Sequence, residues 1–210
     1  MNIEKYIDGV IPFIKKWWFS FILIVPIWIT IERVVLALTE NIMVAVNYPY
    51  PPLLGFFFLV IDNLDLILHE GGHTIFGFFG WRFLAILGGS LMAVLIPFLL
   101  FLTAWNKKQK ILAQACLFQM GYSTFVSAVY CADAYHKILP LIGNDESKAG
   151  HDYANMLSHF YMVDKNMEVA WIIFAFGVLF LLLCLIWPLL YRRETEYVDL
   201  SKELEKSGLN

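Results

Sequence analysis

Charged residues are scarce in this chain, and cysteine is scarcer still. Asp, Glu, Lys and Arg make up 16% of the 210 residues, and only three residues are Cys. No two cysteines form a Cys-x-x-Cys pair, and all three lie in or beside apolar stretches, which predicts apolar packing rather than disulfides or metal ligands. They are Cys116, Cys131 and Cys184. The net charge of −3 also lacks the basic excess of a nucleic-acid-binding surface, so we expect no nucleic-acid partner.

The chain is rich in apolar residues. They account for 60% of the sequence, whereas soluble domains average about 45–50%. They gather in runs of about 20 residues, the length that an α-helix needs to cross a bilayer. We therefore predict an all-α, polytopic membrane helix bundle with about five transmembrane helices, multi-pass in a cell membrane such as the bacterial inner membrane. The expected spans are residues 17–38, 53–79, 83–105, 111–132 and 169–190.

The polar segments divide the rest of the chain. Residues 1–16 form an N-terminal amphipathic segment, residues 17–190 a single transmembrane domain, and residues 191–210 a charged tail. Within the domain, the polar segment 133–167 separates the fourth and fifth spans. If successive spans alternate in direction, the second and fourth run the same way and end at the same membrane face. The few basic residues slightly favour a cytoplasmic tail.

One stretch carries recognisable metal chemistry. The second expected span contains His69-Glu70-Gly71-Gly72-His73, the pattern His-Glu-x-x-His. On a helix this spacing places two imidazoles one turn apart, where both can bind one zinc ion, beside a carboxylate that can take a proton from water. Ionisable groups in an apolar span are costly and indicate a functional site. We predict one zinc ion per chain, bound by His69 and His73, with Glu70 as the general base.

Acidic residues continue the same face of this helix. Asp62, Asp65, His69 and His73 are separated by three, four and four positions, so they form one polar stripe. Each acid at mid-bilayer costs about 2.5–3.5 kcal/mol, so the stripe must face other helices or a water-filled cavity. We interpret Asp62 and Asp65 as groups that line this cavity or orient the zinc ligands.

The motif leaves one zinc ligand unassigned, because a catalytic zinc usually has three protein ligands. Asp133, at the end of the fourth expected span, and His151, in the polar segment, are equal candidates. Asp152 ranks below these two as a third ligand, and could instead be a helix cap or a carboxylate that orients a ligand imidazole. His136 and His159 are expected to be solvated.

The order of these motifs resembles the site-2-protease family of intramembrane zinc metalloproteases, and more closely a bacterial peptidase-like branch classed with it. The resemblance covers about residues 60–160. It is carried by His69-Glu70-Gly71-Gly72-His73, Gly88-Gly89-Ser90 with Pro97, Tyr130-Cys131-Ala132-Asp133-Ala134 and His151-Asp152-Tyr153. It implies zinc, with His69 and His73 as ligands and Glu70 as base. In site-2 proteases the third ligand is the Asp of a Leu-Asp-Gly segment; Asp133 stands on the equivalent helix but is followed by Ala134.

These features lead to one functional expectation and two alternatives. The chain is expected to be an intramembrane zinc metalloprotease that cleaves a polypeptide in or next to the lipid bilayer, with a zinc-activated water and Glu70 as base. The first alternative is a zinc hydrolase acting on a lipid amide or ester. The second is a zinc-binding or transport protein without catalytic activity.

Overall fold

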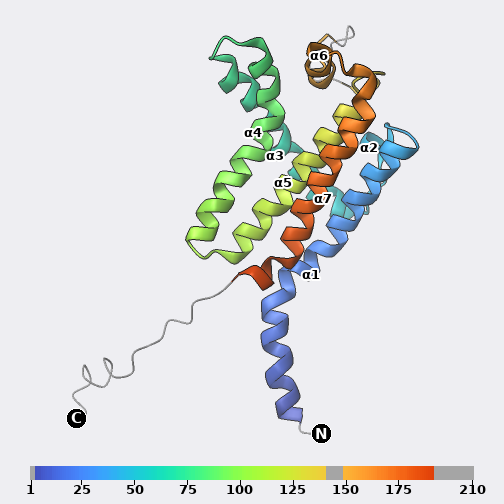
Figure 1. The fold of residues 1–210 in the computed structure, drawn as a ribbon. Coiled ribbons are helices and arrows are strands. Elements are labelled where there is room, and N and C mark those ends of the chain that lie inside the picture. The colour runs from blue at the N-terminus through green and yellow to red at the C-terminus, as the bar shows by residue number, and fades with distance from the viewer. Residues whose placement is uncertain (1–2, 141–148, 192–210) are drawn as a thin grey trace, which may run out of the picture.

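The computed structural model describes residues 3–140 and 149–191, and all regular secondary structure in these ranges is helical. The predicted all-α fold is therefore confirmed (Figure 1). Apart from Tyr191, the predicted charged tail lies outside the described residues, as does part of the polar segment after the fourth span. The elements are α1 (Ile3–Thr39), α2 (Val44–Asn47), α3 (Pro52–Gly77), α4 (Arg82–Asn106), α5 (Lys110–Ala132), α6 (Asp152–His159), the 3-10 turn η1 (Val163–Lys165) and α7 (Asn166–Leu190).

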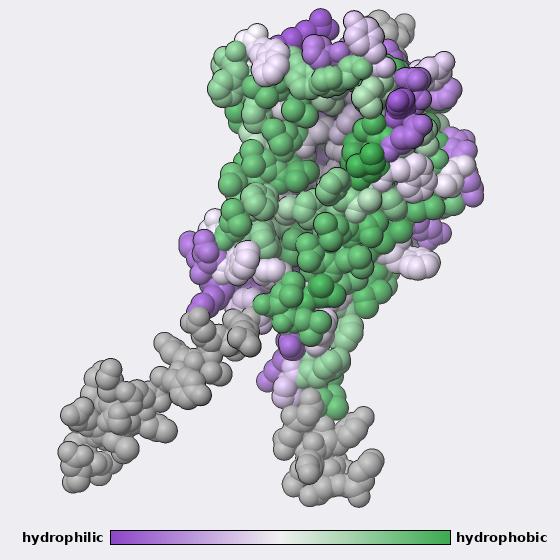
Figure 2. Space-filling view, in the orientation of Figure 1, coloured by the Kyte–Doolittle hydropathy of each residue, from purple (hydrophilic) through white to green (hydrophobic). Residues whose placement is uncertain are grey.

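In the part of the chain that the structure describes, four stretches of helix are long and apolar enough to cross a membrane, and by length and composition they mark a membrane protein. They are Val10–Thr39, Pro52–Gly77, Arg82–Asn106 and Val163–Leu190. Figure 2 shows the matching surface, with hydrophobic residues across the middle of the bundle and hydrophilic residues gathered towards its ends.

The fourth expected span, residues 111–132, forms α5, which has the length of a span but is less apolar than the four helices named above. Most of its residues are buried, because α5 packs between α4, α7 and α1 (Figure 1). A helix enclosed by other helices can carry polar side chains that find partners inside the bundle. Gln114 of α5, for example, donates to the hydroxyl of Ser20 and to the carbonyl of Cys184.

The N-terminal segment is not separate from the first span. Residues 3–16, expected as an amphipathic segment, continue directly into α1, which is a single helix containing Pro12 and Pro26. Near its N-terminal part α1 lies beside the start of α5, where Lys110 donates a hydrogen bond to the carbonyl of Lys16. Farther along both helices, Arg33 donates to the hydroxyl of Tyr122 over 2.9 Å. The two helices therefore run in the same direction.

Helix α3 also runs in this direction, so the expected alternation between the first and second spans is wrong. Phe57 packs on Phe118, and Asp65 farther along α3 accepts a hydrogen bond from Ser123 farther along α5. The reason is that residues 40–51 turn back along α1, and Tyr50 meets Arg33 before α3 begins. Helix α3 thus starts partway along α1. As expected, α3 and α5 finish at the same end of the bundle, and α6 lies there too (Figure 1).

Candidate metal centre

Three donor atoms converge at the C-terminal half of α3. Nε2 of His69 and Nε2 of His73 lie 3.0 Å apart, as the one-turn spacing of the motif predicts. Oδ2 of Asp152, the first residue of α6, lies 3.1 Å from each of these nitrogens. The three atoms form a nearly equilateral triangle that joins α3 to a segment about 80 residues later in the chain.

The triangle has the dimensions of one face of a zinc site. With zinc–nitrogen and zinc–oxygen distances of about 2.0–2.1 Å, neighbouring ligands of a tetrahedral ion are about 3.3–3.4 Å apart. The observed edges are within a few tenths of an ångström of this value. Two imidazoles and one carboxylate are also a ligand set that catalytic zinc uses. The residues present therefore fit a zinc ion, with a fourth position left for water or substrate.

The other ring nitrogen of His73 fixes which nitrogen is available to a metal. Nδ1 of His73 lies 2.8 Å from the backbone carbonyl of Ala85 on α4. Because a carbonyl can only accept, Nδ1 carries the proton, and Nε2 of the neutral ring keeps its lone pair for a ligand bond. This pairing of a ligand imidazole with a backbone acceptor is the usual arrangement in protein metal sites.

Glycines bring α4 against the histidines. A Cβ atom on Gly72 of α3 would overlap the backbone of Gly88 on α4, so the two helices could not approach as closely with any other residue there. A Cβ atom on Gly89 would lie 2.5 Å from Nε2 of His73 and 2.8 Å from Nε2 of His69. The second glycine of the Gly88-Gly89-Ser90 segment therefore leaves room for both imidazoles.

Asp152 is held in its charged form. Burial on its own raises the pKa of this carboxyl group, but the contacts with His69 and His73 outweigh burial and lower the pKa below its usual value. A charged carboxylate is the form that binds a metal ion. The sequence ranked Asp152 below Asp133 and His151 as a ligand and offered it as a helix cap or an orienting carboxylate. The structure places its carboxylate directly against both imidazoles.

Asp133 and His151, the two predicted candidates for the third ligand, are not brought to the histidines. They face each other in a separate buried pair, with Oδ2 of Asp133 3.5 Å from Nε2 of His151. Nδ1 of His151 accepts a hydrogen bond from the backbone N–H of Ala154, and its ring stacks on Tyr130 at 4.2 Å between centroids. Both nitrogens of His151 are thus turned towards groups other than a metal at His69 and His73, whereas the next residue, Asp152, reaches that position.

The remaining predicted site residues line one cleft. Asp62 and Asp65 border it together with the two histidines and Glu70, in a cavity of about 800 Å³. Asp62 accepts a hydrogen bond from the hydroxyl of Tyr122, and Asp65, which is buried, accepts one from Ser123. Glu70 is exposed in this cleft, and a carboxylate oxygen lies within 4.8 Å of the ligand nitrogens of both histidines. His136 and His159 are exposed, as expected.

Some residues of the site are not evident from the sequence. The carbonyl of Ala85 leaves no sequence signal, because any residue supplies one. Gly89 could have been found, since the Gly88-Gly89-Ser90 segment stands out, but its contact with the imidazoles depends on how α4 packs. Compared with protein-family models, curated proteins and solved structures, the chain shows no match. Its function must therefore be inferred from the site itself.

Proposed function

We propose that this chain is an intramembrane zinc metalloprotease, multi-pass in a cell membrane, that hydrolyses a polypeptide segment in or next to the bilayer. The observation that carries the proposal is the triangle of His69 Nε2, His73 Nε2 and Asp152 Oδ2, with edges of 3.0–3.1 Å, beside the carboxylate of Glu70. A zinc ion bound by these atoms would polarise the scissile carbonyl and make a water molecule acidic enough to attack it near neutral pH.

The chain's own residues supply the proton transfers. Glu70 is close to the imidazoles and exposed in the cleft, so it can accept a proton from the attacking water. It then passes that proton to the leaving amine nitrogen as the peptide bond breaks. Asp152 and the two histidines would hold the ion, and the carbonyl of Ala85 favours the His73 tautomer that can bind it.

The cleft supports hydrolysis rather than transport. A transporter needs polar groups along a path that opens to both membrane faces. The cleft with the histidines is bordered instead by α3, the C-terminal half of α5, Val46 of α2, Asp152 of α6, and Pro140 and Gly150, which lie between α5 and α6. The histidines and Asp152 of this cleft lie towards the end where α3 and α5 finish, which favours a substrate site over a path across the membrane.

The basic residues support an orientation with the metal centre away from the cytoplasm. Because α1 and α5 begin at the same end, the exposed lysines before α1's apolar part and between α4 and α5 lie together there. The exposed ones are Lys15, Lys16, Lys107 and Lys108, and the half-buried Lys110 lies with them. By the positive-inside bias this end is cytoplasmic. In a bacterial inner membrane, the end with α6 and the histidines would then face the periplasm.

Glu70→Gln is the decisive variant for this function. It should retain zinc, because its carboxylate is not part of the ligand triangle, and should lose peptide hydrolysis by about 10²–10⁴-fold. The measurement combines zinc content of the purified protein with turnover of membrane-protein and lipid substrates, followed by product analysis. Full turnover in Glu70→Gln would overturn the mechanism. Cleaved lipid with intact peptide would assign the site to a lipid amide or ester.

A further inference from the structure

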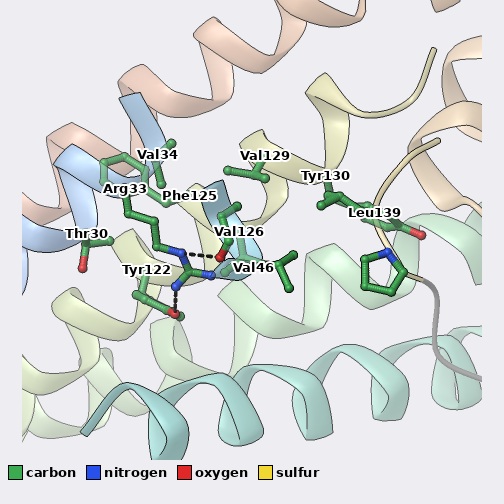
Figure 3. Close-up of a pocket in the computed structure, with 12 residues that line it drawn as sticks. Thr30, Arg33, Val34, Val46, Tyr122, Phe125, Val126, Val129, Tyr130 and Leu139 are labelled. Carbon is green, nitrogen blue, oxygen red and sulfur yellow. Dashed lines mark hydrogen bonds between the residues drawn. The ribbon is translucent and has the colours of Figure 1, made fainter. Parts of the chain in front are cut away.

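A second cavity adjoins the metal cleft. It has a volume of about 190 Å³ and lies between α1, α5 and the segments around residues 45 and 140 (Figure 3). Four residues line both cavities: Val46, Val126, Tyr130 and Pro140. Apolar cavities of about 150 Å³ hold a ligand the size of benzene, so this one can hold a side chain or a short aliphatic group.

Among the described residues that line it, the cavity has apolar walls and one charged residue, Arg33. Figure 3 shows Arg33 and Tyr122 at one end of the pocket, with Tyr130 and Leu139 at the other. Nε of Arg33 donates to the carbonyl of Ala45 over 2.7 Å, and Nη1 donates to the hydroxyls of Tyr50 and Tyr122 over 2.5 and 2.9 Å. The guanidinium is therefore fixed in place by three hydrogen bonds.

The third nitrogen of Arg33 has no hydrogen bond to any residue in the described ranges 3–140 and 149–191. The side chain of Arg33 is only 15% exposed, and Arg33 lines the cavity. An oxygen of the Asp62 carboxylate lies 4.0 Å from Nη1 of Arg33, too far for a hydrogen bond. This oxygen accepts a hydrogen bond from the hydroxyl of Tyr122. A buried cation among apolar walls is costly unless its donors find acceptors, and Nη2 carries two N–H groups that can both point to one anion.

We propose that this cavity is a substrate subsite that binds a carboxylate carried on a short aliphatic chain. The guanidinium binds the carboxylate, which suits its planar pair of donors, and the apolar walls hold the methylene groups. In a polypeptide this chemistry comes from an acidic side chain or from the C-terminal carboxylate. The two cavities share four lining residues, so a ligand in this subsite would lie beside the candidate metal centre. The inference therefore rests on the proposed peptidase function.

Direct binding to metal-free protein tests the subsite separately from catalysis. The probes are hexanoate and hexanamide, which have the same chain and differ in charge, titrated by calorimetry into EDTA-treated protein in detergent. Hexanoate should bind about tenfold or more tightly than hexanamide, as expected for hydrogen bonds to a charged group. Equal binding of the two probes would overturn the proposal. Because no metal is present, this result does not depend on whether the chain hydrolyses peptides.

Two variants locate the binding. Arg33→Gln should remove the preference for hexanoate, and Val129→Phe, which keeps Arg33 but fills the cavity, should weaken both probes. Val129 lines the second cavity and not the metal cleft. Circular dichroism checks that each variant is folded. If Arg33→Gln does not fold, the Val129→Phe variant and the comparison of hexanoate with hexanamide in the natural chain test the proposal. Unchanged hexanoate binding in a folded variant would overturn the proposal.

Short apolar peptides distinguish the two sources of carboxylate. One carries an internal Glu and an amidated C-terminus, and the other carries Gln in its place and a free C-terminus. Displacement of hexanoate by the first assigns an acidic side chain, and displacement by the second assigns the C-terminus. Displacement by neither would overturn the assignment of the cavity to substrate. Hexanoate bound through Arg33 in a chain without zinc or peptide turnover would leave the subsite standing and overturn the proposed function alone.

Discussion

Oδ2 of Asp133 lies 3.5 Å from Nε2 of His151, and both side chains are completely buried. The same Asp133 carboxylate accepts hydrogen bonds from the backbone N–H groups of Ile138 and Leu139, and His151 caps the start of α6 through Ala154. The pair therefore ties the end of α5 to the beginning of α6. Because Asp152 follows His151 directly, this contact positions the carboxylate that forms the third corner of the candidate metal centre.

The first prediction separates the ligand from its support. Asp152→Ala should abolish zinc binding, because it removes one corner of the donor triangle. His151→Ala should weaken zinc binding by about 10–100-fold, which is the usual effect of removing a group that orients a ligand. The measurement is zinc affinity by competition with a chelator, with His73→Ala as the variant that loses the site.

His151→Asn is the matched control for this comparison. Asn can accept the hydrogen bond at the start of α6 that His151 accepts now, so zinc affinity should be partly restored relative to His151→Ala. If His151 were itself a ligand, His151→Asn would lose zinc as completely as His73→Ala does. Zinc retained in Asp152→Ala would likewise remove Asp152 from the ligand set.

A second prediction concerns the space for the imidazoles. Gly89→Ala should lower zinc affinity by about tenfold or more, because the new methyl group would lie 2.5 Å from Nε2 of His73 and displace the ring from the metal. Gly71→Ala is the control on the neighbouring helix, where a Cβ meets no atom within 4 Å. It should leave zinc affinity unchanged and stabilise α3 by up to about 1 kcal/mol. Equal zinc affinity in both variants would contradict the close packing of α4 on the histidines.

The metal motif could be read from the sequence because its geometry is local. His69, Glu70 and His73 lie on one face of any helix that contains them, whatever the rest of the chain does. The third donor is different. His151 and Asp152 are neighbours in the sequence, and only the buried contact of His151 with Asp133 decides which of the two points at the histidines.

The direction of α3 relative to α1 could not be predicted from the sequence either. The prolines at 49, 51 and 52 predict a break between the first two spans, and the structure has one. They do not say whether the chain crosses the bundle or turns back along α1. The contact of Tyr50 with Arg33 shows that the chain turns back, and Arg33 therefore lines the second cavity.

A third prediction is a pH dependence of stability that comes from Asp133. Burial raises the pKa of this carboxyl group, but the contact with His151 and the backbone N–H groups of Ile138 and Leu139 outweigh burial and lower it below 3.8. Since the pKa is lower in the folded chain than in the unfolded one, Asp133 stabilises the fold above about pH 4. This contribution is lost as the pH falls through the lower, folded pKa.

Asp133→Asn tests that dependence. The difference in unfolding free energy between the natural chain and the variant should be present at pH 5 and should shrink as the pH falls below about 4. Denaturant unfolding of metal-free protein in detergent measures it without interference from zinc binding. A difference that grew as the pH fell would contradict the assignment of a charged Asp133.

The last prediction concerns the orientation in the membrane, which follows from the parallel direction of α1 and α5. Because this arrangement collects the exposed lysines at the end opposite the histidines, a cysteine at position 107 should face the cytoplasm and one at position 82 the outside. In intact cells a membrane-impermeant maleimide should label Arg82→Cys, and it should label Lys107→Cys only after permeabilisation. The three natural cysteines are free but buried, so the unaltered chain should give little background.

Labelling of Lys107→Cys in intact cells, with Arg82→Cys protected, would place the candidate metal centre on the cytoplasmic side. Labelling of both would contradict the bundle's arrangement, because residues 82 and 107 flank opposite ends of α4.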